Sequence, residues 1–181
     1  MFEIQWFGDI LGGGVVMASI YSGLKHNASI YSGLKCNKQL ILMVGLPRSG
    51  KTTKALSVQQ EYRKAGRNVE IVYPDNLRLA LFVRKSSWYI TEVCVKAGFI
   101  ISDIVIVDST HATRADRLTW MCPSIAYSWK RYYLFMDVHK DVCIERAIQD
   151  GRQDLIPVIE KMSATFEPPV DLAEGFPSLA L

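Results

Sequence analysis

The sequence predicts an α/β fold in which helices cover both faces of a parallel β-sheet. From Lys38 onward, short apolar segments alternate with segments of helical periodicity, and this alternation is typical of a parallel sheet. The segment Ile104–Val107 is apolar at every position, as expected of a strand buried on both faces. A glycine-bearing turn at residues 45–50 joins the first apolar segment to the first long helical segment.

Four segments are predicted to form the strands of this sheet. They are residues 40–44, 69–73, 104–107 and 132–136. The first reads Leu-Ile-Leu-Met-Val, which is a short continuous apolar run of the length that buried strands have.

The segments between and after these strands are predicted to form helices. The first helix is expected at residues 51–65, where Ala55, Val58 and Tyr62 fall on one stripe and Gly66 ends the helix. The other helical segments are residues 76–83, 88–96, 114–121, 140–150 and 157–165. Pro157 suits the first turn of the last helix.

The first 37 residues differ from the rest of the chain. Residues 18–25 and 28–35 are the same eight residues, Ala-Ser-Ile-Tyr-Ser-Gly-Leu-Lys, and three consecutive glycines precede them at 12–14. Two copies are too few for a stacked repeat fold. We expect residues 1–37 to be a flexible N-terminal extension and residues 38–178 to form the folded domain.

Composition excludes several classes of protein. The chain has 181 residues, 49% hydrophobic and 22% charged, which argues against a disordered or coiled-coil protein. The apolar stretch at 10–24 contains the three glycines and is preceded by Glu3 and Asp9 but by no Lys or Arg, so it suits neither a membrane span nor a signal peptide. The four cysteines show no C-x-x-C pair. We expect no membrane partner and a reducing, cytoplasmic location.

The strongest motif is the turn that follows the first predicted strand. Residues 45–52 read Gly-Leu-Pro-Arg-Ser-Gly-Lys-Thr and match the Walker A pattern G-x-x-x-x-G-K-[ST], whose backbone amides cradle phosphates at a helix N-terminus. Lys51 is expected to reach the β- and γ-phosphates of ATP, and the Thr52 hydroxyl to bind Mg²⁺. The predicted nucleotide-binding residues are Gly45, Pro47, Arg48, Ser49, Gly50, Lys51, Thr52 and Thr53. For Arg48, contact with ATP, contact with an acceptor and simple exposure all remain open.

Two carboxylates follow predicted strands at the edge of the sheet where ligands bind. Asp108 directly follows Ile104–Val107 and is expected near the metal, so Thr52 and Asp108 form the predicted magnesium site. Asp75 follows the second strand, and Arg78 comes three residues later. Asp75 could accept the proton of an attacking hydroxyl or cap a helix, and Arg78 could hold an anionic acceptor.

Together these residues resemble the P-loop kinases that include bacteriophage polynucleotide kinase and related small AAA-type ATP-binding proteins. The resemblance covers residues 38–175. The Walker A turn is followed by Asp75-Asn76-Leu77-Arg78, similar to the family's D-x-x-R element, and by residues 107–111, Val-Asp-Ser-Thr-His, similar to its D-x-T-[HN] segment. In this family the Asp activates a 5′-hydroxyl and the Arg contacts the acceptor's phosphate.

The same resemblance extends to the predicted lid. Residues 145–152 resemble the arginine-bearing lid that closes over ATP, which implies that Arg146 and Arg152 are catalytic beside Lys51, Asp75, Arg78 and Asp108. Their spacing is wider than in family lids and places Gln149 and Asp150 between them. Which of the two arginines contacts ATP is left open.

The preferred acceptor is the 5′-hydroxyl end of a polynucleotide. Residues 38–96 hold eleven basic and four acidic residues, net +7, which suits a polyanion but also an ordinary solvated surface. The alternatives are a kinase for a small metabolite or nucleotide sugar, and an ATP-binding module without catalysis. Trp88, Tyr89 and Trp120 could stack on a base or belong to the core. For His111, a structural hydrogen bond and a catalytic part both remain open.

Overall fold

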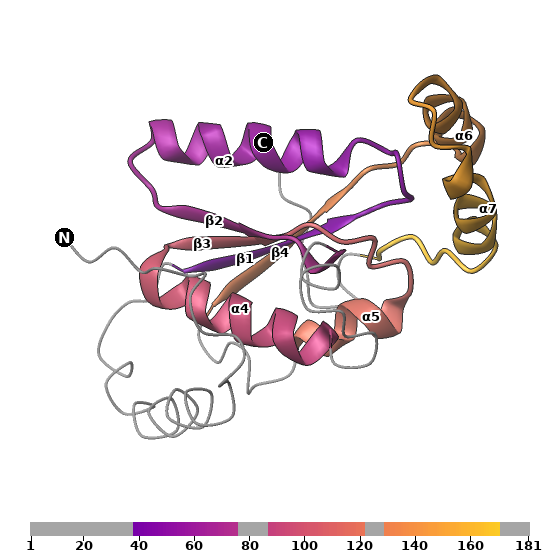
Figure 1. The fold of residues 1–181 in the computed structure, drawn as a ribbon. Helices are drawn as coiled ribbons and strands as arrows, with labels where there is room; N and C mark the ends of the chain where they lie inside the picture. Colours follow the sequence, from indigo (N-terminus) through magenta and orange to yellow (C-terminus); the bar gives the residue numbers. More distant parts are fainter. Residues whose placement is uncertain (1–37, 76–86, 122–128, 171–181) are drawn as a thin grey trace, which may run out of the picture. The chain divides into compact units, whose positions relative to one another are not determined.

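The sheet has four parallel strands in the order β2-β3-β1-β4. The computed structural model describes residues 38–75, 87–121 and 129–170 (Figure 1). The strands are β1 (Gln39–Val44), β2 (Val69–Val72), β3 (Ile104–Val107) and β4 (Lys130–Phe135). The central strand β1 pairs with β3 from Gln39↔Ile104 and with β4 from Gln39↔Lys130. The predicted α/β fold with a parallel sheet is therefore confirmed.

Helices cover both faces of this sheet. Helix α2 (Lys51–Lys64) lies on one face, and α4 (Ser87–Ile101) and the short α5 (Arg114–Leu118) lie on the other (Figure 1). Side chains of β1 alternate between the two layers, because successive residues of a strand point to opposite faces. Ile41 and Met43 pack in the core that contains Val58 of α2, whereas Leu40 and Leu42 pack in the core with the α4 residues. The two-sided burial explains why the central strands β1 and β3 are apolar over almost their whole length, whereas β2 carries the exposed Glu70 and β4 begins with Lys130 and Arg131.

A helical pair follows β4 at the carboxyl end of the strands (Figure 1). It consists of α6 (Lys140–Gln149) and α7 (Ile156–Ala164), joined through the 3₁₀ turn Gln153–Leu155. Cys143 and Ala147 of α6 are fully buried against Ile159 of α7, and Leu46 of the turn after β1 belongs to the same cluster. This cluster fixes α6 beside the turn after β1.

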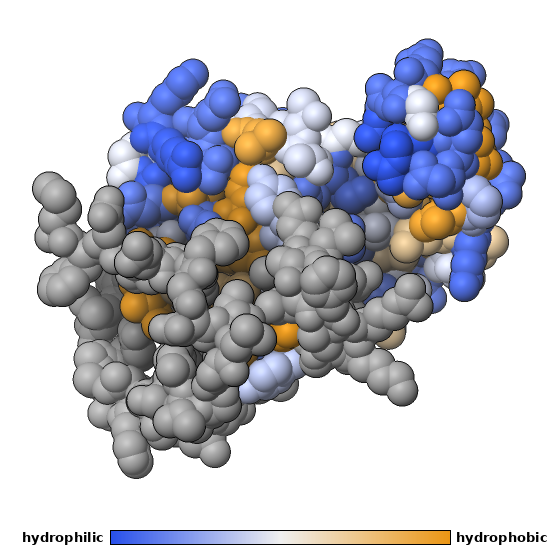
Figure 2. Space-filling view, in the orientation of Figure 1, coloured by the Kyte–Doolittle hydropathy of each residue, from blue (hydrophilic) through white to orange (hydrophobic). Residues whose placement is uncertain are grey.

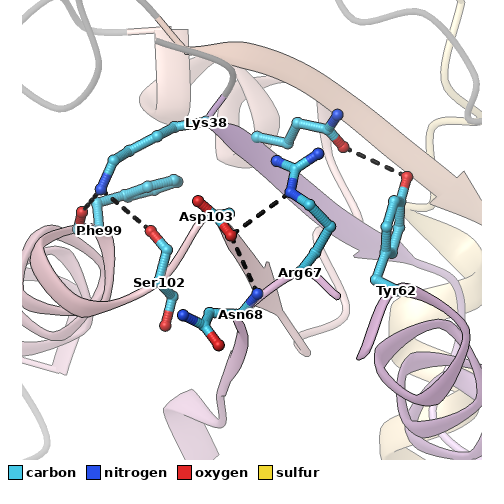
Figure 3. Close-up of polar contacts among 8 residues, drawn as sticks. Lys38, Tyr62, Arg67, Asn68, Phe99, Ser102 and Asp103 are labelled. Atoms are coloured by element: carbon cyan, nitrogen blue, oxygen red, sulfur yellow. Dashed lines mark hydrogen bonds and ion pairs between the residues drawn. The ribbon is translucent and has the colours of Figure 1, made fainter. Parts of the chain in front are cut away.

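The opposite edge of the sheet, at the amino ends of the strands, is closed by polar contacts (Figure 3). The Asp103 side chain accepts a hydrogen bond from the Asn68 amide at 3.0 Å and forms an ion pair with Arg67 at 3.5 Å. The Lys38 ammonium donates to the carbonyl oxygens of Phe99 and Ser102. These contacts fix the end of α4 and the starts of β1, β2 and β3, so this edge is structural.

Several element boundaries differ from those predicted. Helix α4 continues five residues beyond the predicted end at 96, and the helix predicted at 114–121 is an α-helix to Leu118 followed by the 3₁₀ turn Thr119–Met121. Strand β4 begins two residues earlier than predicted. The helix predicted at 76–83 and the extension predicted at 1–37 lie outside the described residues. Within the part of the chain that the structure describes, no helix has the length and apolar character that crossing a membrane requires.

Candidate nucleotide-binding site

At two positions of the turn between β1 and α2, the backbone has a conformation that suits only glycine. Gly45 has φ of 150° and Gly50 has φ of 98°. A Cβ atom on Gly45 would lie 2.8 Å from Ser49 Oγ, closer than real side chains come, and 3.0 Å from both Cβ and the carbonyl oxygen of Met136. The glycines therefore let the turn close tightly against β4 and start α2 at Lys51.

Lys51 begins α2 and is buried, with 9% of its surface exposed. Its ammonium donates a hydrogen bond to the Leu46 carbonyl oxygen at 2.6 Å, so the side chain folds back over the turn. Burial lowers the pKa of Lys51, and the nearby Asp108 carboxylate opposes this shift. The turn thus holds one buried cation at the N-terminus of a 14-residue helix, which favours a bound anion.

Thr52 and Asp108 meet across the two central strands. The Thr52 hydroxyl donates to Asp108 Oδ2 at 2.6 Å, and the Asp108 amide donates to the Val72 carbonyl at 3.0 Å. Burial raises the pKa of Asp108, while the Thr52 hydrogen bond and the Lys51 charge oppose that shift. The structure therefore brings together the hydroxyl and the carboxylate that the sequence assigns to the magnesium site.

The donors around the turn fit a phosphate chain with Mg²⁺. Ser49 Oγ is buried and has no hydrogen-bond partner among the described residues, so a hydroxyl is available at the base of the turn. Thr52 and Thr53 are exposed, and Pro47 and Arg48 are half-buried. Hydroxyl and carboxylate oxygens are the ligands that Mg²⁺ prefers, and the buried cation suits phosphate.

His111 is a structural residue of this site. It is 2% exposed, has φ of 43°, and its Nδ1 lies 2.8 Å from the Met43 carbonyl oxygen. Because a carbonyl only accepts, Nδ1 carries the proton, and burial lowers the pKa of His111 to about 4. Its own carbonyl accepts from the buried Arg117 guanidinium at 2.9 Å. The neutral ring thus ties the loop after β3, which carries Asp108, to β1.

Asp75 lies at the same edge of the sheet, three residues beyond the end of β2, and is exposed. The negative charge of Asp75 raises the pKa of both Lys51 and Asp108. Asp75 is therefore within electrostatic range of the predicted phosphate and metal residues. Arg78, its predicted partner, lies outside the described residues.

The two predicted lid arginines are placed differently. Arg146, on α6, donates from Nη1 to the Arg48 carbonyl oxygen at 3.2 Å and so contacts the turn. Arg152 is exposed and paired with Asp154 through two hydrogen bonds of 2.9 Å. In this structure only Arg146 of the two touches the Walker A turn.

Two other side chains bear on the site. Asp150, which sequence reasoning treated only as a spacer between the arginines, forms an ion pair with Arg48 of the turn, a contact for which the sequence holds no signal. Trp120 is 1% exposed and packs edge-on against His111. It therefore belongs to the core, whereas Tyr89 is 53% exposed. The side chain of Trp88 lies outside the described residues.

The chain is similar to one protein family and to several solved structures. A family model described as "Chromatin associated protein KTI12" matches residues 39–173. No curated protein matches the chain. Among solved structures, that of the Mycobacterium tuberculosis APS kinase CysC in complex with AMPPNP and APS is similar, with a TM-score of 0.56 and 17% identity, covering 74% of this chain and 84% of that chain.

Two further structures resemble the chain. The gluconokinase from Sinorhizobium meliloti has a TM-score of 0.52 and 14% identity over 75% of this chain and 79% of its own. The structure of APE1195 has a TM-score of 0.57 and 17% identity over 74% of this chain and 82% of its own. The similarity to known kinases shows that the parallel sheet and its helices form a P-loop kinase fold.

Proposed function

The chain belongs to the chromatin-associated protein KTI12 family, and from that premise we propose that it is an ATP-dependent phosphotransferase that moves the γ-phosphoryl group to a hydroxyl acceptor. The observation that carries the proposal is the hydrogen bond of 2.6 Å between Thr52 and Asp108, directly beside the buried ammonium of Lys51. A metal-binding pair next to a phosphate-binding cation is the arrangement that phosphoryl transfer needs.

The Walker A turn holds the nucleotide in this proposal. Its backbone amides and the N-terminus of α2 face the phosphates, and Lys51 exchanges the Leu46 carbonyl for phosphate oxygens. The buried hydroxyl of Ser49 adds a donor. The residues assigned to nucleotide binding are Gly45, Pro47, Arg48, Ser49, Gly50, Lys51, Thr52 and Thr53.

Thr52 and Asp108 would hold Mg²⁺ at the edge of the turn. The bound ion supplies positive charge that stabilises the phosphate oxygens during transfer. Asp108 must be ionised for this role, and the Thr52 hydroxyl and the Lys51 charge both favour its ionised form against the effect of burial.

Asp75 would act as the general base on the acceptor hydroxyl. It is exposed to solvent at the edge of the sheet and lies within electrostatic range of Asp108 and Lys51, so an acceptor can reach it from outside the nucleotide turn. Arg78 would hold the acceptor, and Arg146 and Arg152 would neutralise charge on the phosphoryl group.

The acceptor proposed first is the 5′-hydroxyl end of a polynucleotide. The sequence Asp75-Asn76-Leu77-Arg78 supports it through its similarity to the D-x-x-R element of polynucleotide kinases, and the net charge of +7 over residues 38–96 supports it through attraction of a polyanion. A small hydroxylated metabolite would use the same base but would bind with little dependence on salt.

A second candidate is an ATP-dependent switch that acts through a protein partner without transferring phosphate. The family description favours it, because it names an association with chromatin and no reaction. The same Walker A turn would bind ATP, and Asp75 would then have no chemical part.

The test is transfer of labelled γ-phosphate from Mg²⁺-ATP to a 5′-hydroxyl oligonucleotide. Lys51→Met and Asp75→Asn are compared with wild type. Glu70→Gln serves as the matched control, because Glu70 is exposed on β2, the strand that precedes Asp75, and lies away from the site. Transfer that is lost in the first two variants and kept in the control supports the kinase. ATP binding without transfer to oligonucleotides or small acceptors contradicts the kinase and favours the switch.

A further inference from the structure

Arg48 occupies an unusual position in the Walker A turn. Its backbone has φ of 65°, in the left-handed region that residues other than glycine seldom adopt. Its guanidinium forms an ion pair with the carboxylate of Asp150, the residue that caps the carboxyl end of α6. The ion pair therefore joins the tip of the phosphate-binding turn to the helix that carries the predicted lid arginine.

A second contact joins the same two elements. Arg146 donates from Nη1 to the Arg48 carbonyl oxygen at 3.2 Å. Arg146 and Asp150 are four residues apart and thus lie on one face of α6. Nη1 of Arg146 also lies 3.9 Å from the position that a Cβ on Gly50 would occupy, which places the guanidinium over the turn.

Three described cations at the turn are thus engaged with protein atoms. Arg48 is bound to Asp150, Arg146 to the Arg48 carbonyl, and Lys51 to the Leu46 carbonyl at 2.6 Å. A triphosphate entering the turn carries more negative charge than one carboxylate and offers the paired oxygens that guanidinium groups bind well. It would therefore compete directly with Asp150 for Arg48.

We propose that Asp150 is a positioning residue that latches the carboxyl end of α6 onto the Walker A turn through Arg48, and that ATP releases this end by replacing Asp150 as the partner of Arg48. The inference rests on the proposed ATP site. Leu46 stays packed against Cys143 and Ala147, so α6 remains anchored through Ala147. Release then frees the residues after Ala147, including Arg152, and lets the Arg146 side chain exchange the Arg48 carbonyl for the phosphates.

The latch opposes nucleotide binding, because part of the binding free energy is used to open it. The pair is partly exposed, with 31% of the Arg48 side chain and 54% of the Asp150 side chain accessible. Exposed ion pairs contribute about 0.2–1 kcal/mol, which corresponds to a change in affinity of up to about fivefold.

Asp150→Asn tests the latch, with Asp141→Asn as the control for the same change of charge in the first turn of the same helix. Hydrogen exchange of the amides of residues 148–152 in the nucleotide-free protein should be faster in Asp150→Asn than in wild type or the control. ATP should bind about two- to fivefold more tightly to Asp150→Asn.

Arg48→Ala separates the latch from a general loss of structure. It removes the partner of Asp150 and also the partner of the triphosphate, so it should speed exchange like Asp150→Asn but weaken ATP binding. Unchanged exchange and unchanged ATP affinity in Asp150→Asn would overturn the latch. Failure of wild type to bind ATP would instead overturn the proposed function, and the exchange data would still decide whether the contact holds α6 in the free protein.

Discussion

The imidazole of His111 donates a hydrogen bond of 2.8 Å to the carbonyl oxygen of Met43, and this bond joins the loop after β3 to the strand that carries the Walker A turn. The neighbouring amide of Gly45 donates to the Thr110 carbonyl at 3.1 Å. These two hydrogen bonds to backbone carbonyls hold the loop that carries Asp108 opposite Thr52. The consequence is that His111 acts on the site through position rather than through proton transfer.

His111→Ala should lower the free energy of unfolding, because it removes the buried hydrogen bond that the His111 ring donates to the Met43 carbonyl. Removing one partner of a buried hydrogen bond costs about 1–3 kcal/mol. His111→Asn should recover much of the loss, because asparagine can donate a hydrogen bond and tolerates the φ of 43° at this position. Urea denaturation measures both variants, and equal losses in the two would argue against the hydrogen bond as the cause.

Stability should fall when the pH is lowered from about 6.5 toward 4. Burial lowers the pKa of His111 to about 4 in the folded state, whereas the unfolded state titrates near 6.5. The unfolded state therefore binds more protons in that window, and the stabilisation present above pH 6.5 is lost progressively, on the order of 3 kcal/mol in all. Denaturation curves across this range should show the slope in wild type and a shallower one in His111→Asn. A slope of equal size in both proteins would assign the effect to other groups.

Gly45→Ala should destabilise the protein and abolish nucleotide binding, since the added Cβ meets Ser49 Oγ at 2.8 Å and the Met136 backbone at 3.0 Å. Overpacking of this kind costs about 1–3 kcal/mol. Gly66→Ala is the matched control, because Gly66 also has positive φ, 76°, but no atom lies within 4 Å of its Cβ position. Calorimetry and ATP titration should show a purely conformational penalty of about 1–2 kcal/mol in the control, with nucleotide affinity retained.

Asp108→Asn should separate stability from metal binding. Burial raises the pKa of Asp108 in the folded state, so stability falls as the pH rises from the unfolded-state pKa to the raised one, and the ionised carboxylate opposes folding above it. The neutral amide should leave the protein as stable as wild type or more stable, while Mg²⁺-dependent ATP affinity falls by about tenfold or more. Titration of ATP with and without Mg²⁺ measures the loss, and a variant that keeps the full magnesium effect would exclude Asp108 as a ligand.

The raised pKa of Asp108 also predicts how the affinity for Mg²⁺ depends on pH. Below its raised pKa, Asp108 is protonated and cannot bind a cation, so the contribution of Mg²⁺ to ATP affinity should decline as the pH is lowered through that value. The decline should be absent in Asp108→Asn. Titration series at several pH values test this, and a parallel decline in the variant would point to another group.

The sequence predicted the sheet well because its central strands are apolar on both faces, β3 at every position and β1 from Leu40 to Val44. Ile104–Val107 was predicted with its observed bounds. The extension of α4 to Ile101 was missed, because Ile100 and Ile101 are 57% and 61% exposed and apolar residues on a helix surface break the expected periodicity. From the sequence, Trp120 could either stack on a base or belong to the core. Its burial against His111 in the structure shows that it belongs to the core.

The site was predicted only as far as its motif residues. The Walker A turn and Asp108 could be found because strand ends of a parallel sheet share one edge. The ion pair between Arg48 and Asp150 could not, because it depends on how α6 packs, and that is set by burial of Cys143 and Ala147 on its other face. Long-range contacts between polar surface residues leave no periodic pattern in a sequence.

The strand order also determines when the Walker A turn can become rigid during folding. Strand β1 is made early, yet its two hydrogen-bonded neighbours are β3 and β4, which come much later in the chain. Pairings between distant segments form slowly because a long loop must close first. During synthesis, β1 therefore remains an unpaired apolar strand until residue 104 has been added and keeps an open edge until residue 135, and over that interval chaperone binding or aggregation competes with folding.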